Sequence, residues 1–343
     1  MSAGSVFEQG QLEKILVGAF KPKEQKAPIP LKQKKRKVLV LAGPTAVGKT
    51  EMSLLLARAL GGEIISADSM QVYRGLDIGT AKATWQQRAC VPHHLLDIRD
   101  VHETFNIVDF YYEARHCCEK LVANDVVPIV VGGAGFYIHS FLYGPPNGPP
   151  SVDEVRKALE KEAERSGIDF LYERLCKQDP EYAATITSHD RQKIIRALEI
   201  MTLTGNTVSR LAWNQRKVSL NYDFRCWFVH RSRDSLYERV DMRCDMMLAD
   251  GFLREVEEYE SAGIREHPSI SQAIGYRQAL EYLDSPRTID DYDEFVRLFK
   301  QSSRRYVKKQ FTWFKKEPIF RWLDLDLHDT ETAVDIMAQD FKR

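Results

Sequence analysis

Short runs of apolar, often β-branched residues alternate with longer amphipathic segments over the first half of the chain. The amphipathic segments predict helices at 49–60 and 107–123. The apolar runs predict strands at 38–42, 63–66, 95–98 and 126–131. Such alternation is typical of an α/β fold, in which helices wrap a parallel sheet and ligands bind at the carboxyl ends of the strands.

The pattern changes at the segment YGPPNGPPS, residues 143–151, whose four prolines and two glycines break any regular element. Helical periodicity follows at 153–165, 170–177, 190–203 and 235–248, and strand-like runs return at 224–229 and 319–323. The simplest interpretation is an α/β core formed by residues 37–144 and 223–343, interrupted by a helical insertion at 145–222.

Residues 1–36 precede this pattern and end in the basic run KQKKRK, residues 32–37. Such a run can bind RNA or act as a localisation signal, and it can equally belong to a solvated leader. We interpret residues 1–36 as a flexible leader.

Composition narrows the class of protein. The 49 basic residues balance the 49 acidic ones, so a polyanionic partner would have to meet a local patch. The six cysteines have no metal-ligand spacing and no signal peptide precedes them, which indicates a reducing, cytoplasmic location. The longest mostly apolar run, 126–138, contains Pro128 and three glycines and is shorter than the roughly 20 residues of a membrane span, so none is expected.

The segment GPTAVGKT fits the phosphate-binding pattern G-x-x-x-x-G-K-[ST] and lies between a predicted strand and a predicted helix. Backbone N–H groups of such a loop surround phosphate oxygens, Lys49 reaches the outer phosphates, and Thr50 can bind Mg²⁺. The fold is therefore expected to be P-loop NTPase-like. The phosphate-binding residues are Gly43, Pro44, Thr45, Ala46, Val47, Gly48, Lys49 and Thr50. The motif predicts phosphates and leaves the reaction open.

A P-loop NTPase usually carries an acidic residue at the end of a later hydrophobic strand, where it holds Mg²⁺. Here the strand at 126–131 ends in glycines, and the nearest strand-end carboxylate is Asp68, directly after the strand at 63–66. Asp68 is a candidate general base on an incoming acceptor. A metal ligand and a turn cap are the alternatives.

Two arginines, Arg239 and Arg243, are four residues apart and so share one helix face. They could clamp a diphosphate leaving group, although solvated surface arginines have the same spacing. His93, His94 and Asp97 match no standard metal site, and no metal is expected there.

The segment RRYVKKQFTWFKKE, residues 304–317, interleaves cations with aromatic rings. RNA-binding proteins use cations for phosphates and rings for base stacking, and an amphipathic helix with buried rings is the alternative. Arg191, Lys193 and Arg196 form a second basic patch in the insertion. Together the two patches favour a folded RNA as partner.

These pieces resemble the tRNA dimethylallyltransferase family, also called tRNA isopentenyltransferases. The matching stretches run from about residue 38 to about residue 323: GPTAVGKT, IISADSMQVYRGLDIGTAK, PHHLLDI, VPIVVGGAGFYI, DRQKIIRALE, RVDMRCDMML, AIGYRQ and RRYVKKQFTWF. The longest of them is highly specific, whereas the phosphate loop alone is not. The sequence carries no zinc-finger extension of the kind found in many eukaryotic relatives, which favours a bacterial type.

The resemblance implies that the loop holds dimethylallyl diphosphate rather than ATP. The dimethylallyl group would pass to N6 of adenosine 37 in the anticodon stem-loop of tRNAs that read codons beginning with U. Asp68 would then be the general base, while Lys49, Thr50 and Arg243 would stabilise diphosphate with Mg²⁺ as cofactor. A monomer is expected.

The resemblance also implies the residues that contact tRNA. Those matching the family's segments are Asp68, Ser69, Met70, Gln71, Ala134, Gln192, Lys193, Arg196, Gln272, Gly275, Tyr276, Arg277, Lys308, Lys309, Gln310, Phe311, Thr312, Trp313, Phe314 and Lys315. Ala134 departs from the family, which usually has Thr there. Either Gln71 or a water replaces that hydroxyl, or the acceptor is placed differently.

Three other functions remain open at this point. An adenylate dimethylallyltransferase would use a free nucleotide, although neither the insertion nor the basic patches would then be needed. A P-loop kinase or ATPase would turn over a γ-phosphate, and an RNA-binding module would give no product.

Overall fold

The computed structural model describes residues 36–211 and 221–343. The leader expected at 1–36 therefore lies outside the described residues, except for Arg36, which begins the first strand. Over the described part, the chain divides into a larger unit, residues 36–145 and 221–343, and a smaller unit, residues 146–211. No described helix is long and apolar enough to cross a membrane.

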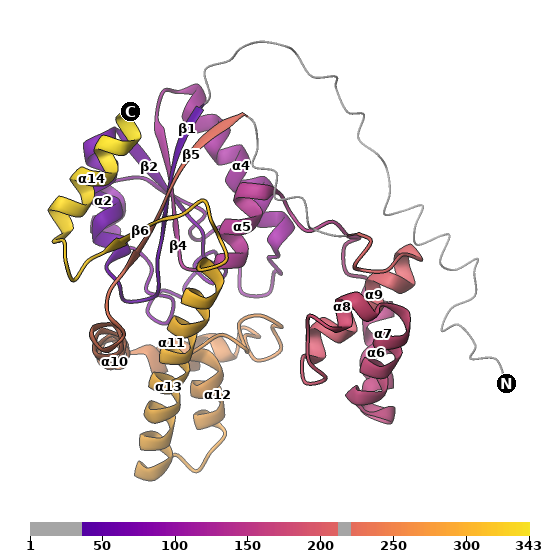
Figure 1. Ribbon diagram of the computed structural model, residues 1–343. Coiled ribbons are helices and arrows are strands. Elements are labelled where there is room, and N and C mark those ends of the chain that lie inside the picture. Colours follow the sequence, from indigo (N-terminus) through magenta and orange to yellow (C-terminus); the bar gives the residue numbers. More distant parts are fainter. Residues whose placement is uncertain (1–35, 212–220) are drawn as a thin grey trace. The chain divides into compact units, whose positions relative to one another are not determined.

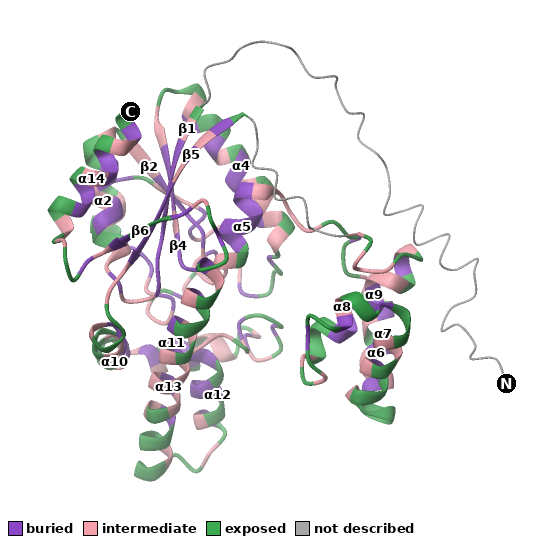
Figure 2. Cartoon of the chain, in the orientation of Figure 1, coloured by how far each residue is buried: buried purple, intermediate pink, exposed green. Residues whose placement is uncertain are grey.

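The larger unit is built on a parallel sheet of six strands in the order β3-β2-β4-β1-β5-β6 (Figure 1). The strands are β1 (Arg36–Ala42), β2 (Gly62–Ser66), β3 (His93–His94), β4 (Val127–Gly132), β5 (Tyr222–His230) and β6 (Arg321–Asp324). The central strand β1 reads RKVLVLA, and every residue from 38 to 42 is buried (Figure 2). A continuous apolar run is what a strand covered on both faces requires. The expected P-loop NTPase-like α/β fold is confirmed.

Helices cover both faces of this sheet. On one face α2 (Lys49–Leu60) packs against α14 (Thr330–Lys342), and on the other α4 (Ile107–Ala123) packs against α5 (Gly135–Tyr143) (Figure 1). The predicted helices at 49–60 and 107–123 have the observed bounds. Asn106 and Asp109 form a capping box at the start of α4, and Gly61 in the left-handed region ends α2, so local sequence defines these ends.

A helical layer lies beyond the carboxyl ends of the strands (Figure 1). It consists of α10 (Arg233–Ala249), α11 (Phe252–Glu260), α12 (Tyr276–Leu283) and α13 (Ile289–Phe314), which pack in the pairs α10 with α13, α10 with α11, α11 with α12 and α12 with α13. The helical layer brings α10 and α13 to the edge of the sheet where the phosphate loop begins.

The short helix α3 (Trp85–Cys90) is not part of this layer and precedes β3.

The strand predicted at 95–98 is wrong. The observed strand β3 comprises only His93 and His94, and the next residues form bends in which Leu95 and Asp97 have positive φ angles of 62° and 54°. Leu95 is buried without belonging to the sheet. An apolar run reports burial, and it does not distinguish a strand from an irregular buried segment.

The smaller unit contains α6 (Asp153–Ser166), α7 (Ile168–Gln178), α8 (Pro180–Ala183) and α9 (Arg191–Thr204). Its own core is apolar and includes Leu159, Leu171, Leu175 and Leu198. Buried Glu199 accepts hydrogen bonds from Ser151 Oγ (2.6 Å) and from the Val152 amide (2.8 Å), which ties α9 to the segment that precedes α6.

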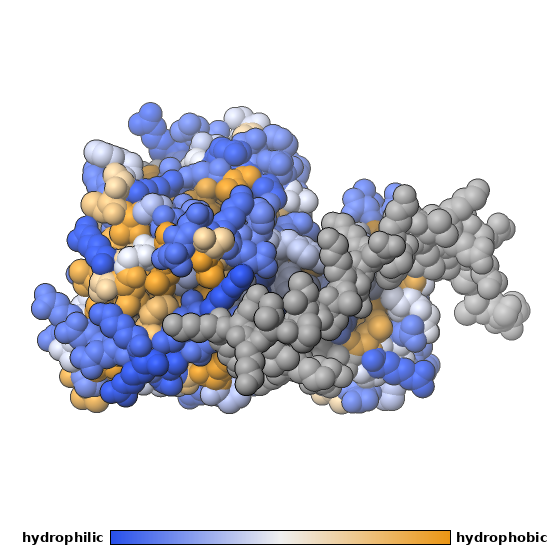
Figure 3. Space-filling view, turned by 90° about the horizontal axis from the view of Figure 1, so that it is seen from above, coloured by the Kyte–Doolittle hydropathy of each residue, from blue (hydrophilic) through white to orange (hydrophobic). Residues whose placement is uncertain are grey.

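The surface facing the viewer in Figure 3 shows hydrophilic residues interspersed with smaller groups of hydrophobic ones. Among the large hydrophobic side chains exposed in the described chain, Met242 and Met246 stand out, because both line the cavity described next.

Candidate active site

The phosphate-binding segment, residues 43–50, connects β1 to α2. Gly48 has a φ of 110°, and a side chain at Gly43 would approach the Val229 carbonyl oxygen to 2.6 Å, so both glycines are required. No described side chain caps α2, which leaves the amides of its first turn available to an anion. Lys49 Nζ donates to the carbonyls of Gly43 (2.9 Å) and Pro44 (2.7 Å) and is thereby held over the loop.

This loop opens on a cavity of about 510 Å³. The phosphate loop, the segment after β2, the end of β4, α10 and α13 all contribute to its walls. Its polar lining includes Thr45, Lys49, Thr50, Asp68, Gln71, Arg239, Arg243, Tyr306 and Gln310. The structure thus brings the predicted phosphate-binding residues, the candidate base and both arginines to one place.

Two cations of the cavity, Lys49 and Arg243, are poorly solvated. Burial, together with the nearby charge of Arg243, lowers the pKa of Lys49 to about 7, and Asp68 opposes the shift. Burial likewise lowers the pKa of Arg243, against the attraction of Asp68. Cations held in this way gain strongly from an anionic ligand.

The two arginines of α10 have different surroundings. Arg239 is exposed, and its Nε donates to the Ala46 carbonyl (2.8 Å), so it fastens α10 to the phosphate loop. Arg243 is partly buried and lies close enough to Lys49 to lower its pKa, while Asp68 favours the charged form of Arg243.

Asp68 follows β2 and is partly buried. Its Oδ1 accepts hydrogen bonds from the amides of Met70 (2.8 Å) and Gln71 (3.4 Å), so the alternative of a turn cap is observed for this oxygen. Within the described residues, no donor contacts Oδ2. One oxygen holds the turn while the other can accept a proton, and the two roles are compatible.

Gln310 and Tyr306 complete the wall on α13. Gln310 is 4% exposed, accepts from the Thr45 amide (3.0 Å) and donates to the Gly133 carbonyl (3.0 Å), so it links the phosphate loop to the segment after β4. Burial raises the pKa of Tyr306, and Asp68 adds to the shift. Tyr306 appeared in the sequence only as one ring of the basic run, since helical spacing could not show that it faces a cavity.

The Gln71 amide is engaged at both ends. Its Oε1 accepts from Ser66 Oγ (2.8 Å), and its Nε2 donates to the carbonyls of Thr80 (3.1 Å) and Ala81 (3.4 Å). Gln71 therefore helps to form the cavity wall and offers no free group in place of the hydroxyl missing at Ala134.

Comparison with known proteins shows which family this chain belongs to. The model for the family "IPP transferase" matches residues 71–317. The chain belongs to the IPP transferase family. It is 56% identical to the tRNA dimethylallyltransferase of Protochlamydia amoebophila, over 98% of this chain and 97% of that protein. It is 48% identical to the tRNA dimethylallyltransferase of Chlamydia pneumoniae, over 90% of each.

Solved structures agree with this membership. A tRNA isopentenylpyrophosphate transferase from Bacillus halodurans is 36% identical, with a TM-score of 0.65 over 90% of this chain and 97% of that one. A eukaryotic dimethylallyltransferase acting on tRNA is 30% identical, with a TM-score of 0.73 over 90% of this chain and 79% of that one.

Among the residues that family resemblance assigns to tRNA, those on α13 divide between two faces. Lys308, Lys309, Thr312 and Lys315 are exposed, whereas Gln310 and Phe314 are buried. The Phe314 ring packs 4.8 Å from that of Phe228, so it belongs to the core and is not free to stack on a base. The alternative of an amphipathic helix with buried rings therefore holds for Phe314.

The other tRNA-assigned segments are likewise mixed. Gln272 and Arg277 are exposed, but Tyr276 is 1% exposed and donates its hydroxyl to Glu255 Oε1 (2.6 Å). In the smaller unit Gln192 and Lys193 are exposed.

Arg196, on the same helix, is instead tied down. It pairs with Glu199 Oε2 (2.8 Å) and donates to the Pro149 carbonyl (2.5 Å). A charged residue in a basic motif can thus serve the fold, which the sequence does not reveal.

The pair His93–His94 with Asp97 forms no metal site. His94 Nε2 contacts Glu63 Oε2 (2.6 Å), and Asp97 pairs with Lys82 (2.7 Å) and Arg88. Nowhere in the described residues do three or more His, Cys, Asp or Glu side chains form a group that could hold a metal. The phosphate-binding end of the cavity is different, because Thr50 lines it. Thr50 could be the protein ligand of a magnesium ion that is otherwise bound by water and by phosphate oxygens of a ligand.

Proposed function

We propose that this protein transfers the dimethylallyl group of dimethylallyl diphosphate to N6 of adenosine 37 in the anticodon stem-loop of tRNAs that read codons beginning with U. One observation carries the proposal: a single cavity is lined by a phosphate loop with Lys49, by Arg243 and by the carboxylate of Asp68, which acts on the pKa of both cations. Family membership supplies the chemistry of the donor and acceptor.

The donor would bind with its diphosphate in the phosphate loop. Cleavage of the allylic C–O bond leaves negative charge on the diphosphate and positive charge on the allyl carbon. Lys49, Arg243 and the first amides of α2 would stabilise the departing oxygens, which is where the developing negative charge lies. Thr50 would help to hold Mg²⁺, an ion that would supply further positive charge for the diphosphate.

The acceptor step needs a base within the same cavity. The neutral N6 amine attacks the allyl carbon, a C–N bond forms, and the amine proton passes to Asp68 Oδ2, which accepts no hydrogen bond within the described residues. The products are N6-dimethylallyladenosine and diphosphate. Because adenosine 37 lies in a loop, its base can be extruded into the cavity at modest cost.

Two features argue against nucleotide hydrolysis and a free-nucleotide acceptor. The strand β4 ends at Gly132 and is followed by Gly133, so it offers no strand-end carboxylate to hold the Mg²⁺ of a nucleoside triphosphate. The exposed Lys308, Lys309 and Lys315 supply charge for a polyanion larger than a mononucleotide.

Competition between acceptors tests the proposal. The full chain is incubated with dimethylallyl diphosphate, Mg²⁺, and equimolar unmodified tRNA and AMP, and nucleosides are analysed by mass spectrometry. A parallel reaction contains ATP and is assayed for released phosphate. We expect product in tRNA and none in AMP. Product in AMP alone would favour the adenylate dimethylallyltransferase, and release of phosphate from ATP would favour a kinase or ATPase.

A further inference from the structure

The segment from Asp68 to Lys82 forms one wall of the cavity, to which it contributes Asp68, Gln71, Thr80 and Ala81. It contains turns and bends and no helix or strand in the described structure. Backbone hydrogen bonds within its turns and to residues 97–99 hold part of it, and contacts made by side chains and by other elements hold the rest.

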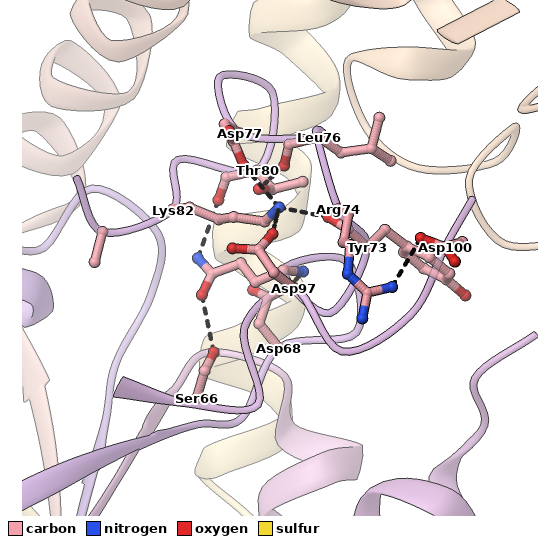
Figure 4. Close-up of polar contacts among 12 residues, drawn as sticks. Ser66, Asp68, Tyr73, Arg74, Leu76, Asp77, Thr80, Lys82, Asp97 and Asp100 are labelled. Carbon is pink, nitrogen blue, oxygen red and sulfur yellow. Dashed lines mark hydrogen bonds and ion pairs between the residues drawn. The ribbon is translucent and has the colours of Figure 1, made fainter. Parts of the chain in front are cut away.

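A buried lysine holds this segment from within. The Lys82 side chain is 1% exposed, and its Nζ donates to Asp77 Oδ1 (2.8 Å), to Asp97 Oδ1 (2.7 Å) and to the Tyr73 carbonyl (Figure 4). All three hydrogens of the ammonium group have an acceptor, so the buried charge is fully compensated.

A buried carboxylate holds the same segment from outside. Glu255 of α11 accepts the amides of Asp77 (2.7 Å), Ile78 (2.6 Å) and Gly79 (3.0 Å), and it also accepts the Tyr276 hydroxyl (2.6 Å). These four hydrogen bonds use the full accepting capacity of a carboxylate. Glu255 itself does not line the cavity.

The segment also packs against α11 and α12 without spare room. A side chain at Gly75 would overlap the Tyr259 hydroxyl, and one at Gly79 would lie 2.3 Å from the Phe252 ring. At these glycines the backbone of the segment lies directly against aromatic side chains of α11. The Glu255 carboxylate adds hydrogen bonds between α11 and residues 77–79.

We infer that Glu255 is a positioning residue for the RNA acceptor. Its hydrogen bonds to residues 77–79 fix the position of the adjacent carbonyls of Thr80 and Ala81. These carbonyls accept hydrogen bonds from Gln71 Nε2. Gln71 in turn lies three residues from Asp68, whose Oδ1 accepts its backbone amide. The phosphate loop and α10, which would bind the donor, take no part in these hydrogen bonds. The inference rests on the proposed function.

Steady-state kinetics with tRNA and dimethylallyl diphosphate tests this role. Glu255→Ala leaves three backbone amides unpaired, so we expect KM for tRNA to rise about tenfold or more while KM for dimethylallyl diphosphate stays within about twofold. Tyr276→Phe removes one of the four hydrogen bonds and should shift KM for tRNA in the same direction by a smaller factor. Glu258→Gln, an exposed residue of the same helix, is the matched control and should behave as the parent.

A purely structural role predicts something different. It would lower the concentration of active enzyme, so kcat would fall with both KM values unchanged, and that result would overturn the inference. If the parent protein gives no product at all, the proposed function fails. The inference is then decided by filter binding of tRNA and calorimetry with inorganic diphosphate: weaker tRNA binding by Glu255→Ala with unchanged diphosphate binding supports it, and unchanged tRNA binding contradicts it.

Discussion

At the scale of single residues, the cavity separates its charges by function. Lys49 and Arg243 are cations whose pKa values are lowered chiefly by burial, whereas Asp68 pairs one oxygen with the backbone and, within the described residues, accepts no hydrogen bond at the other. A buried cation and a carboxylate with a free oxygen are the two groups that diphosphate departure and amine deprotonation require.

The lowered pKa of Lys49 predicts a pH dependence of donor binding. With a pKa of about 7, the side chain loses its proton in the free protein as pH rises above 7, and a bound diphosphate raises the pKa by favouring the charged form. Affinity for inorganic diphosphate should therefore fall between about pH 7 and pH 9, with uptake of a proton on binding. Calorimetry in buffers of different ionisation enthalpy measures both quantities. Lys49→Arg is the control, because its side chain stays charged over this pH range. Any proton exchange that this variant shows comes from titration of the diphosphate, and the proton uptake assigned to Lys49 should be absent.

The two oxygens of Asp68 predict a difference between two variants. Asp68→Asn keeps an acceptor for the Met70 amide but cannot take up a proton, whereas Asp68→Ala loses both functions. We expect Asp68→Asn to lower kcat by about 10²-fold or more, the usual low end for loss of a general base, with tRNA binding nearly intact. Single-turnover kinetics with bound tRNA isolates the chemical step. Near-normal turnover of Asp68→Asn would refute the assignment of the base.

At the scale of elements, α13 has two faces of different character. Gln310 and Phe314 face the cavity wall and the core, while Lys308, Lys309 and Lys315 face solvent. The same helix therefore completes the cavity and presents a row of cations beside it, which is the arrangement expected if a base enters the cavity while its phosphates stay outside.

The exposed face of α13 predicts the salt dependence of tRNA binding. Replacing Lys308 and Lys309 together with Ala should weaken binding and reduce the slope of log K against log salt by up to about 2, because each lysine that neutralises a phosphate releases counterions. Filter binding over a range of salt concentrations measures the slope. Lys342→Ala, exposed on α14, is the control. An unchanged slope in the double variant would mean that this face does not meet phosphates.

Elements with local signals could be predicted from the sequence, and those determined by distant contacts could not. The helices at 49–60 and 107–123 have their caps in the neighbouring sequence, and their predicted bounds match. The prediction of a strand at 95–98 failed because Asp97 forms ion pairs with Lys82 and Arg88 instead of joining the sheet. Glu255 was missed because its partners lie 176 to 178 residues away in the chain, and a glutamate within an amphipathic helix gives no sign of them.

At the scale of the whole molecule, two basic patches of this neutral chain lie in different units. The larger unit has the exposed lysines of α13, and the smaller unit has exposed Arg191, Gln192 and Lys193 on α9. A mononucleotide would need neither, whereas the loop and stem of a folded RNA offer phosphates over a longer distance. We therefore expect both units to contribute to tRNA affinity.

The most direct test of the central claim is to locate the modified nucleotide. A tRNA that reads a codon beginning with U, prepared without modifications, is treated with the protein, dimethylallyl diphosphate and Mg²⁺, digested with ribonuclease and sequenced by mass spectrometry. We predict the added mass of one dimethylallyl group on adenosine 37 and on no other nucleotide, and none when Asp68→Asn replaces the parent protein. Modification at another position, or an unmodified tRNA with the active parent protein and donor present, would contradict the account.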